Sequence, residues 1–180
     1  MTSSMLSVIA QTSDARKVEA DRLFQQGIEQ FEEIQDGQFQ HQAAVESWEK
    51  ALAIYREIKD SRGEIATLVQ LSYGYYLRNQ YQKAIEALQQ PLSIARQHDD
   101  PQSVAIYLGG LGEGYTLLKQ YPQAIQVFQE QLQIAQQAGD IQKEAPTLES
   151  LVQAYQTLGK SQEAMAPSAA VSRGSTANHS

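Results

Sequence analysis

Hydrophobic residues recur at helical spacing through most of the chain. Leu68, Leu71 and Tyr75 follow one another at intervals of three and four residues, which places them on one face of an α-helix. Ala84 and Leu88 belong to a second series of the same kind. Polar residues occupy many of the remaining positions, so each segment predicts an amphipathic helix with one buried face.

This pattern repeats every 40 residues. Shifting the chain by 40 positions superposes three copies of the same residue types without a gap. The superposed positions are Ala44, Ala84 and Ala124; Trp48, Leu88 and Phe128; Leu52, Leu92 and Leu132; Leu68, Leu108 and Leu148; and Tyr75, Tyr115 and Tyr155. Repeats of 20 to 50 residues are typical of stacked supersecondary units, because a single unit cannot bury its hydrophobic face alone.

Short polar segments separate the predicted helices. Within a unit the turn falls at 78–80 and again, 40 residues later, at 118–120. Between units, Asp100 is followed by Pro101. An aspartate accepts hydrogen bonds from the free N–H groups at a helix start, and a proline at the first helical position needs no such partner. Each unit is therefore predicted to contain two helices joined by a short turn.

The residues that repeat resemble those of the tetratricopeptide repeat (TPR) family. They are small residues at Ser72 and Gly112, the tyrosines at 75, 115 and 155, the alanines at 84, 124 and 164, and the large residues Trp48, Leu88 and Phe128. The resemblance covers residues 17–165, with units of 40 residues where the usual TPR has about 34. It implies an all-α fold, a right-handed α-solenoid of antiparallel helix pairs known as the TPR superhelix.

The expected array occupies residues 14–165. Its units fall at about 17–59, 61–99, 101–139 and 141–165, and the last of them is partial. The first unit holds five extra residues near 33–39, because Gly27 precedes Ala44 by 17 residues whereas Gly112 precedes Ala124 by 12. We therefore expect a longer first helix or an enlarged first turn.

The two ends depart from the repeat. Residues 1–13 are expected to be a flexible terminus or the remnant of a leader peptide. Residues 166–180 are expected to be disordered, since Ser168, Ser172 and Gly174 stand where the repeat would place large hydrophobic residues. We expect a cytoplasmic protein, with export to the periplasm as the alternative if the N-terminus is a truncated signal peptide. A fragment of a longer TPR protein and an array with an open edge both fit the C-terminal end.

Composition narrows the classes of function. The 180 residues carry 14 Lys and Arg against 21 Asp and Glu, a formal charge of −7, and no cysteine. An acidic chain has no basic stripe for a phosphate backbone, so we expect no nucleic-acid partner. The absence of cysteine excludes disulfides, thiolate metal sites and a cysteine nucleophile. No run approaches the roughly 18 apolar residues that a membrane span needs.

Residues capable of catalysis or metal binding are scattered. His41, His98 and His179 are isolated in the sequence, with His41 expected in a turn, and none has a second ligand at metal-binding spacing. The glycines at 109, 110, 112 and 114 superficially resemble a phosphate loop, but no strand precedes them, and close helix packing explains them better. We expect a non-catalytic protein with no cofactor and no metal.

The remaining candidate is a surface. The TPR resemblance implies that the first helix of each unit lines a concave groove. The positions next to the core stripe then face a peptide: Phe24, Ile28, Phe31, Val69, Tyr73, Tyr76, Glu113, Thr116, Glu149, Gln153 and Gln156. Hydrophobic at one end and acidic at the other, these residues favour a peptide or helix with hydrophobic anchors and a basic end. The alternative for Phe24 and Phe31 is that they complete the core between repeats.

A different function is also open. The unit that starts at residue 141 lacks part of its partner helix, so Leu151, Tyr155 and Leu158 are expected at an uncovered edge. Stacked repeats need a polar end to stay soluble, and such an edge could bind a second copy of the chain. The main expectation is thus a scaffold that binds a protein or peptide, and the alternative is a self-associating assembly module.

Overall fold

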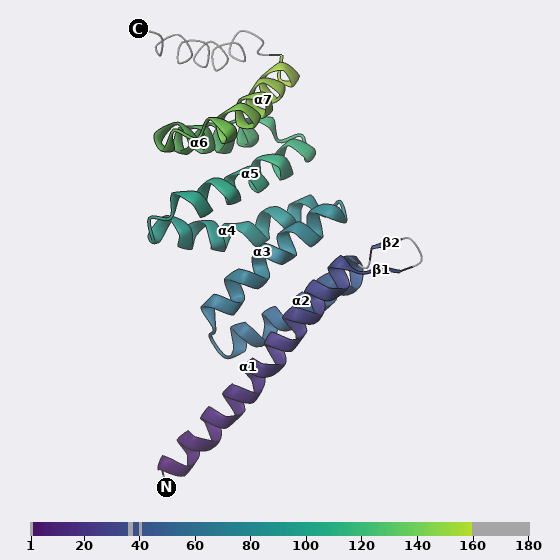
Figure 1. The fold of residues 1–180 in the computed structure, drawn as a ribbon, viewed down its shortest axis with the longest axis vertical. Helices are drawn as coiled ribbons and strands as arrows, with labels where there is room; N and C mark the ends of the chain where they lie inside the picture. The colour runs from purple at the N-terminus through teal and green to yellow at the C-terminus, as the bar shows by residue number, and fades with distance from the viewer. Residues whose placement is uncertain (1, 36–37, 40, 160–180) are drawn as a thin grey trace. The chain divides into compact units, whose positions relative to one another are not determined.

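The computed structural model of this chain describes residues 2–35, 38–39 and 41–159. Within them it contains seven α-helices and one short hairpin (Figure 1). The elements are α1 Thr2–Glu32, β1 Ile34–Gln35, β2 Gln38–Phe39, α2 His41–Glu57, α3 Ser61–Leu77, α4 Tyr81–Gln97, α5 Pro101–Leu117, α6 Tyr121–Ala138 and α7 Ile141–Thr157. The predicted all-α fold of helix pairs is confirmed, apart from the hairpin.

The 40-residue period sets the helix starts. Among the described helices, α3, α5 and α7 begin 40 residues apart, as do α2, α4 and α6. Asp60, Asp100 and Asp140 each accept a hydrogen bond from the backbone N–H three residues later, at 3.1 or 3.2 Å. Such N-caps satisfy a donor that the helix itself leaves unpaired. The same carboxylate therefore starts the first helix of successive units.

The helix ends recur at half that interval. The positive-φ residues of the described chain are Lys59, Asn79, Asp99, Lys119, Gly139 and Gly159, spaced by 20 positions. After the first of them, the N–H of Asp60 donates to the carbonyl of Tyr55 at 2.9 Å, and the N–H of Asp100 repeats this bond to Ala95 at 3.0 Å. A left-handed residue, followed by an N–H that donates to the carbonyl five positions back, is the Schellman ending of a helix. It stops each helix and turns the chain back.

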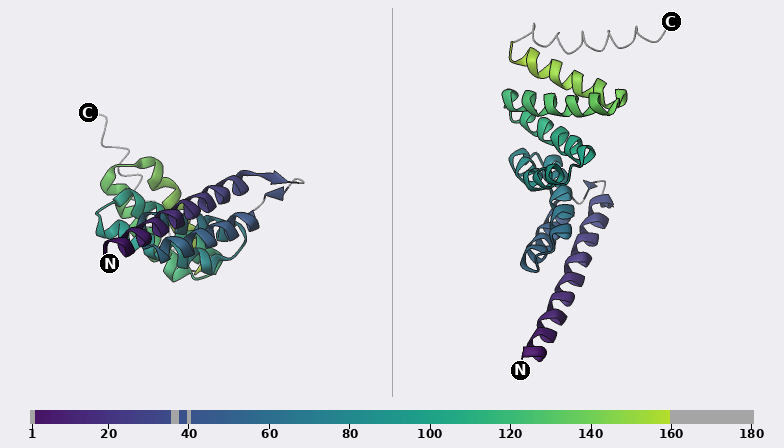
Figure 2. Two further views of the ribbon diagram at one scale, coloured as in Figure 1. Left: turned by 90° about the horizontal axis from the view of Figure 1, so that it is seen from below. Right: turned by 90° about the vertical axis from the view of Figure 1, so that its left-hand side faces the viewer.

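The first unit carries the insertion that the sequence predicted. Helix α1 is longer than the others, and the β1–β2 hairpin enlarges the turn before α2, with Ile34 paired to Phe39 and Gln35 to Gln38. The hairpin lies at the shared end of α1 and α2, which run side by side (Figure 2). Residues 2–13, expected as a flexible terminus, form the first turns of α1. The expected tail at 166–180 and the end of the last unit lie outside the described residues.

The chain divides into two compact units, residues 1–91 and 92–180, and the division falls at Pro91 within α4. From here on, "first unit" and "second unit" mean these two compact units, and the 40-residue units are called repeats. In the first unit α1 packs on α2 and α2 on α3. Its core is built from two clusters of buried side chains: Ala44, Val45, Trp48, Leu52, Leu68, Leu71 and Ala87 in one, and Ala20, Leu23, Ala51, Ile54 and Tyr55 in the other.

The second unit repeats this packing, with α5 on α6 and α6 on α7. The core between α6 and α7 contains Ala124, Ile125, Phe128, Leu151, Ala154 and Tyr155. Gly112 explains how close the helices come, because the ring of Phe128 fills the space that a side chain at position 112 would need. This confirms close packing, rather than a phosphate loop, at that glycine.

Candidate functional site

The first unit exposes a group of aromatic side chains between α1 and α3. The ring of Phe31, near the end of α1, lies 5.4 Å from the ring of Tyr73 on α3 and 5.4 Å from that of Trp48 in the core. The ring of His41 stacks on Phe31 at 4.7 Å. Trp48 is fully buried, whereas 52% of Tyr73 is exposed. The group thus runs from the core to the surface.

The other predicted residues of this surface are less exposed. Phe24 and Ile28 are partly buried against the core, as Phe31 is. They therefore also complete the core, which was the alternative for Phe24 and Phe31. Val69 and Tyr76 are half-buried, and the ring of Tyr76 meets the ring of Tyr81 at 5.9 Å.

In the second unit the predicted residues are polar, and all but the half-buried Thr116 are exposed. Glu113 lies on the exposed side of α5, while the hydroxyl of Thr116 donates to the carbonyl of Gly112 at 2.8 Å within the same helix. On α7, the exposed positions that the sequence selected are Glu149, Gln153 and Gln156. The carboxylates of Glu113 and Glu149 therefore face solvent and are open to a cationic group.

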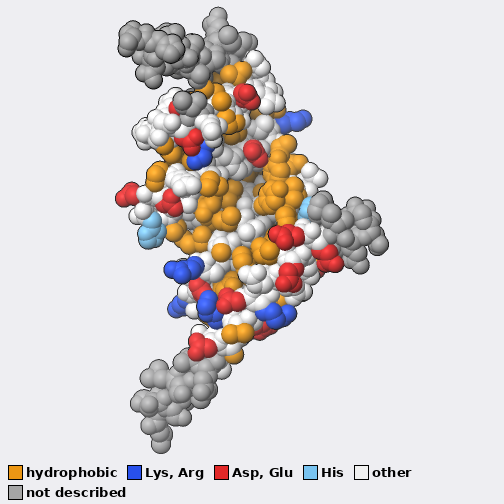
Figure 3. All heavy atoms as spheres, viewed as in Figure 1, with side chains coloured by type: hydrophobic (Ala, Val, Ile, Leu, Met, Phe, Trp, Pro, Cys, Tyr) orange, Lys and Arg blue, Asp and Glu red, His pale blue; other side chains and the backbone are white. Residues whose placement is uncertain are grey.

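On α3 and α5, three exposed large hydrophobic residues were missed. Leu77 on α3, and Ile106 and Leu117 on α5, expose 37%, 58% and 43% of their surface. On the face drawn in Figure 3, hydrophobic side chains reach the surface in groups, with charged side chains around them. Leu77 and Leu117 are 40 residues apart and follow Tyr73 and Glu113 by one helical turn. That spacing was the signal that could have found them.

The predicted self-association edge needs correction. Leu151 and Tyr155 are 1% and 9% exposed, and both pack against α6, with Leu158 beside them. The hydroxyl of Tyr155 accepts a hydrogen bond from the side-chain amide of Gln129 at 2.7 Å. These residues occupy the repeat positions of Leu71 and Tyr75, whose side chains also face the preceding helix. They attach α7 to α6 and do not present an open edge.

In the described part of the chain, polar side chains form contacts within and between the helices. His41 begins α2 instead of lying in a turn. The hydroxyl of Tyr75 donates to Glu49 at 2.7 Å, and burial, with this bond, raises the pKa of Tyr75. No three His, Asp or Glu side chains gather there in a way that could hold a metal ion. None of the described helices is long and apolar enough to cross a membrane.

Comparison with solved structures places this arrangement among repeat proteins. The apo form of RapI matches with a TM-score of 0.69 at 18% identity, over 84% of this chain and 41% of that one. BtubC from P. vanneervenii matches with 0.64 at 21%, over 78% and 59%. A putative kinesin light chain of Podosopora anserina with nearly identical TPR-like repeats matches with 0.66 at 22%, over 93% and 77%. The chain thus spans about half the length of the first two.

Sequence comparison gives the family. No curated protein matches the chain significantly. The family model for the tetratricopeptide repeat matches residues 37–97 and 103–167, which is more than half of the chain. The first range contains α2 to α4, and the second contains most of α5 together with α6 and α7. The chain belongs to the tetratricopeptide repeat family.

Proposed function

We propose that this protein is a non-catalytic scaffold that binds a partner polypeptide through the exposed faces of α3 and α5. The observation that carries the proposal is the position of the exposed large hydrophobic residues. In the described chain they are Val18, Tyr73, Leu77, Ile106 and Leu117. All five lie on first helices of repeats, and the four other than Val18 lie on α3 and α5, two of the helices that line the binding groove in the TPR resemblance.

On the first unit, the surface offers hydrophobic anchoring. Tyr73 and Leu77 are one helical turn apart, so they share a face of α3, and Phe31 packs beside Tyr73. Aromatic residues with a buried base and an exposed edge are common at the energetic centre of protein interfaces. This surface suits a helical or extended segment that inserts hydrophobic side chains.

On the second unit, the surface combines hydrophobic and acidic groups. Ile106 and Leu117 provide exposed hydrophobic area, and Glu113 lies between them in sequence. Glu149 adds a second exposed carboxylate on α7. Such carboxylates favour lysine or arginine in a partner and raise its association rate more than its affinity. We therefore propose a partner segment with hydrophobic anchors and basic residues.

A selection from a displayed random-peptide library tests this function. The wild-type protein is expected to enrich peptides with hydrophobic residues at helical spacing and with Lys or Arg. Affinity for the enriched peptides should fall at least tenfold in the Tyr73→Ser/Leu77→Ser variant, because that variant removes the exposed hydrophobic pair.

Val18→Ser is the matched control, since it removes an exposed hydrophobic residue from α1 outside the proposed surface. It should bind the peptides as the wild type does. The proposal is wrong if no peptide is enriched, or if the enriched peptides bind the double variant and the wild type equally.

A further inference from the structure

A cavity of about 370 Å³ lies in the second unit, at the ends of three helices. It is lined by Pro101, Gln102 and Ala105 of α5, by Gln131, Ile134, Ala135, Gln137 and Ala138 of α6, and by Asp140 and Lys143 at the start of α7. Its volume is within the range of small-molecule sites, and such sites combine apolar walls with a few polar groups. None of the residues proposed above for partner binding lines it.

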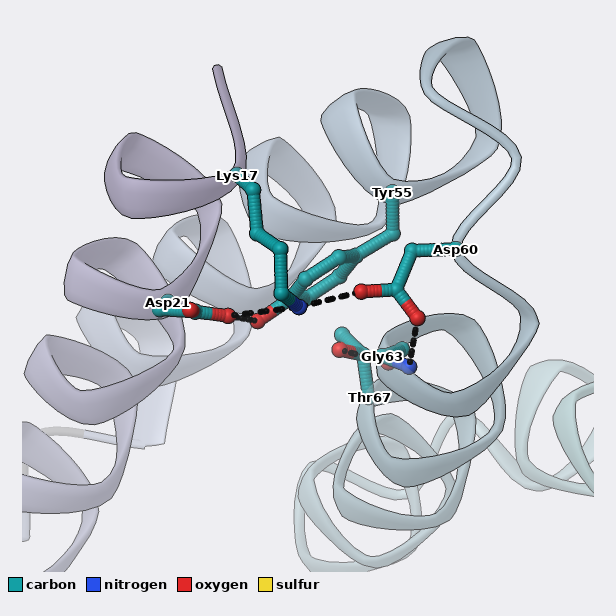
Figure 4. A network of polar contacts seen from close by, with 6 residues as sticks. All are labelled: Lys17, Asp21, Tyr55, Asp60, Gly63 and Thr67. Carbon is teal, nitrogen blue, oxygen red and sulfur yellow. Dashed lines mark hydrogen bonds and ion pairs between the residues drawn. The ribbon is translucent and has the colours of Figure 1, made fainter. Parts of the chain in front are cut away.

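The same repeat positions are filled in the first unit. There the ring of Tyr55 is buried together with Ala20 and Ile54. Its hydroxyl donates to Asp21 at 2.7 Å, and the ammonium group of Lys17 lies 5.6 Å from the ring centre (Figure 4). Lys17 also forms an ion pair with Asp60. In the first unit a tyrosine side chain therefore occupies this site of the repeat, and the charged groups of Lys17, Asp21 and Asp60 lie beside it.

Two residue differences between the repeats explain why the site is filled in the first unit and open in the second. Forty-residue spacing places Ala95 and Ala135 at the position of Tyr55, and Ala138 at the position of Ile58. Ala135 and Ala138 both line the cavity. Ala95 lines a second, more open cavity of similar size in the same unit. An empty space thus accompanies alanine at this position in both later repeats.

The neighbouring position changes with the tyrosine. In the first unit the Tyr55 ring lies so close to Gly63 that a Cβ there would come within 2.3 Å of it. The equivalent residue beside Ala135 is Lys143, whose ammonium group pairs with Asp140 at 2.9 Å. The ring and the glycine are present together in one unit and absent together in the other. The opening beside Ala135 is consequently lined by a lysine, an aspartate and glutamine amides.

We infer that this cavity binds an aromatic side chain of a partner polypeptide, in the place that Tyr55 occupies in the first unit. Ala105 and Ile134 provide the apolar walls, as Ala20 and Ile54 do for Tyr55. The side-chain amides of Gln102 and Gln137 and the charged pair Asp140–Lys143 offer hydrogen bonds to a phenolic hydroxyl at the rim. Tyrosine fits both parts of the site, since its ring is apolar and its hydroxyl is polar.

The test is an amide NMR titration of the full chain with p-cresol, the isolated side chain of tyrosine. Resonances of α5 near Ala105 and of α6 near Ala135 are expected to shift at millimolar concentration. The variant Ala135→Tyr/Lys143→Gly reproduces the pair found at Tyr55 and Gly63 and should weaken binding at least tenfold. Gln133→Tyr adds a tyrosine on the exposed side of α6 and serves as the matched control that should still bind.

Further arms identify the occupant. The peptide acetyl-Gly-Tyr-Gly-amide should shift the same resonances, and 4-methylcyclohexanol should shift them at least fivefold less. If the double variant does not fold, Ala135→Leu is used in its place. Its leucine side chain is smaller than tyrosine but also occupies the cavity, so this variant is likewise expected to bind p-cresol at least tenfold more weakly.

The inference would be overturned by the absence of a shift near Ala135, by equal binding to the filled and wild-type proteins, or by equal binding of 4-methylcyclohexanol. Binding of p-cresol without the peptide would assign the cavity to a free small molecule and would overturn the polypeptide partner. Because the peptide selection depends on Tyr73 and Leu77, its failure and the failure of this titration are distinguishable.

Discussion

The ring of Phe128 on α6 rests on the backbone of Gly112 on α5, so closely that a Cβ on Gly112 would lie 2.3 Å from the Cε1 atom of Phe128. The indole of Trp48 meets Gly27 in the same way in the first unit, also at 2.3 Å. The repeats at 17–59 and 101–139 therefore pack the large aromatic residue of their second helix onto a glycine of their first, whereas the repeat at 61–99 has Leu88 and Ser72 at these positions. This contact sets the approach of the two helices.

Gly112→Ala is expected to lower the free energy of unfolding by about 1–3 kcal/mol, as overpacking of a core does. Gly109→Ala, on the same helix, meets the side-chain amide of Gln131, which donates to the carbonyl of Ala105 at 3.1 Å and would have to move. There the better helix propensity of alanine, about 1 kcal/mol relative to glycine, should offset the loss of that hydrogen bond, about 0.5–1.5 kcal/mol, so little net change is expected. Urea unfolding of the two variants checks this difference. Equal destabilisation would mean that the Phe128 contact has no special role.

Asp60→Ala is expected to destabilise the protein by about 1 kcal/mol through the lost N-cap. Lys17 and the N–H of Gly63 lower the pKa of the Asp60 carboxyl. A pKa below its unfolded value stabilises the fold at neutral pH, and this contribution disappears as the pH falls below about 4. Thermal unfolding between pH 7 and pH 3 should therefore show a shallower loss of Tm in Asp60→Ala than in the wild type. Parallel curves would contradict the role of this carboxylate.

Tyr55→Phe removes the hydrogen bond to Asp21 and is expected to cost roughly 0.5–1.5 kcal/mol. Burial, and then the bond to Asp21, raise the pKa of Tyr55. A raised pKa stabilises the fold fully below the unfolded value near 10 and loses that contribution as the pH rises above it. The loss of Tm between pH 9 and pH 11.5 should therefore be smaller in Tyr55→Phe. Tyr73→Phe, at an exposed ring, is the control and should follow the wild type.

Trp48 is the single tryptophan of the chain and is fully buried. Its Nε1–H donates to the carbonyl of Phe24 at 3.2 Å, so its fluorescence reports the contact between α1 and α2. Acrylamide is expected to quench the native emission little, and quenching should rise in one step with urea. Strong quenching without urea would show that α1 does not cover this ring.

The helix pairs could be predicted because local signals and the repeat agree. Asp60, Asp100 and Asp140 start helices, and the 40-residue register fixed the buried tyrosines and leucines. The hairpin was missed, although Asp36-Gly37 between Ile34 and Phe39 is the sequence pattern typical of a two-residue hairpin turn. The sequence predicted a longer first helix or an enlarged turn there, but not the strand pairing, because the comparison between repeats contains no equivalent of it.

The surface was harder to predict than the fold. The exposure of Tyr73 follows from its angular position around the axis of α3 relative to the core stripe. The same angular rule selected Phe24 and Ile28 on α1, but these two residues also pack against the core, and the angle alone could not show this. Leu151 and Tyr155 were assigned to an edge because no complete helix follows them in the pattern. The helix before them decides their burial, and the buried positions of Leu71 and Tyr75 already indicated it.

The left-handed residues at 59, 79, 99, 119, 139 and 159 also make this chain suitable for module exchange. Deleting residues 100–139 would join Asp99, which has a left-handed backbone, to Asp140, which is an N-cap like Asp100. The turn formed in this way would contain the same residue types as the turn it replaces. Shortened or lengthened versions of the protein should then differ in the number of helix pairs while keeping the turn geometry of each. The length of such a chain can therefore be changed in steps of one 40-residue repeat.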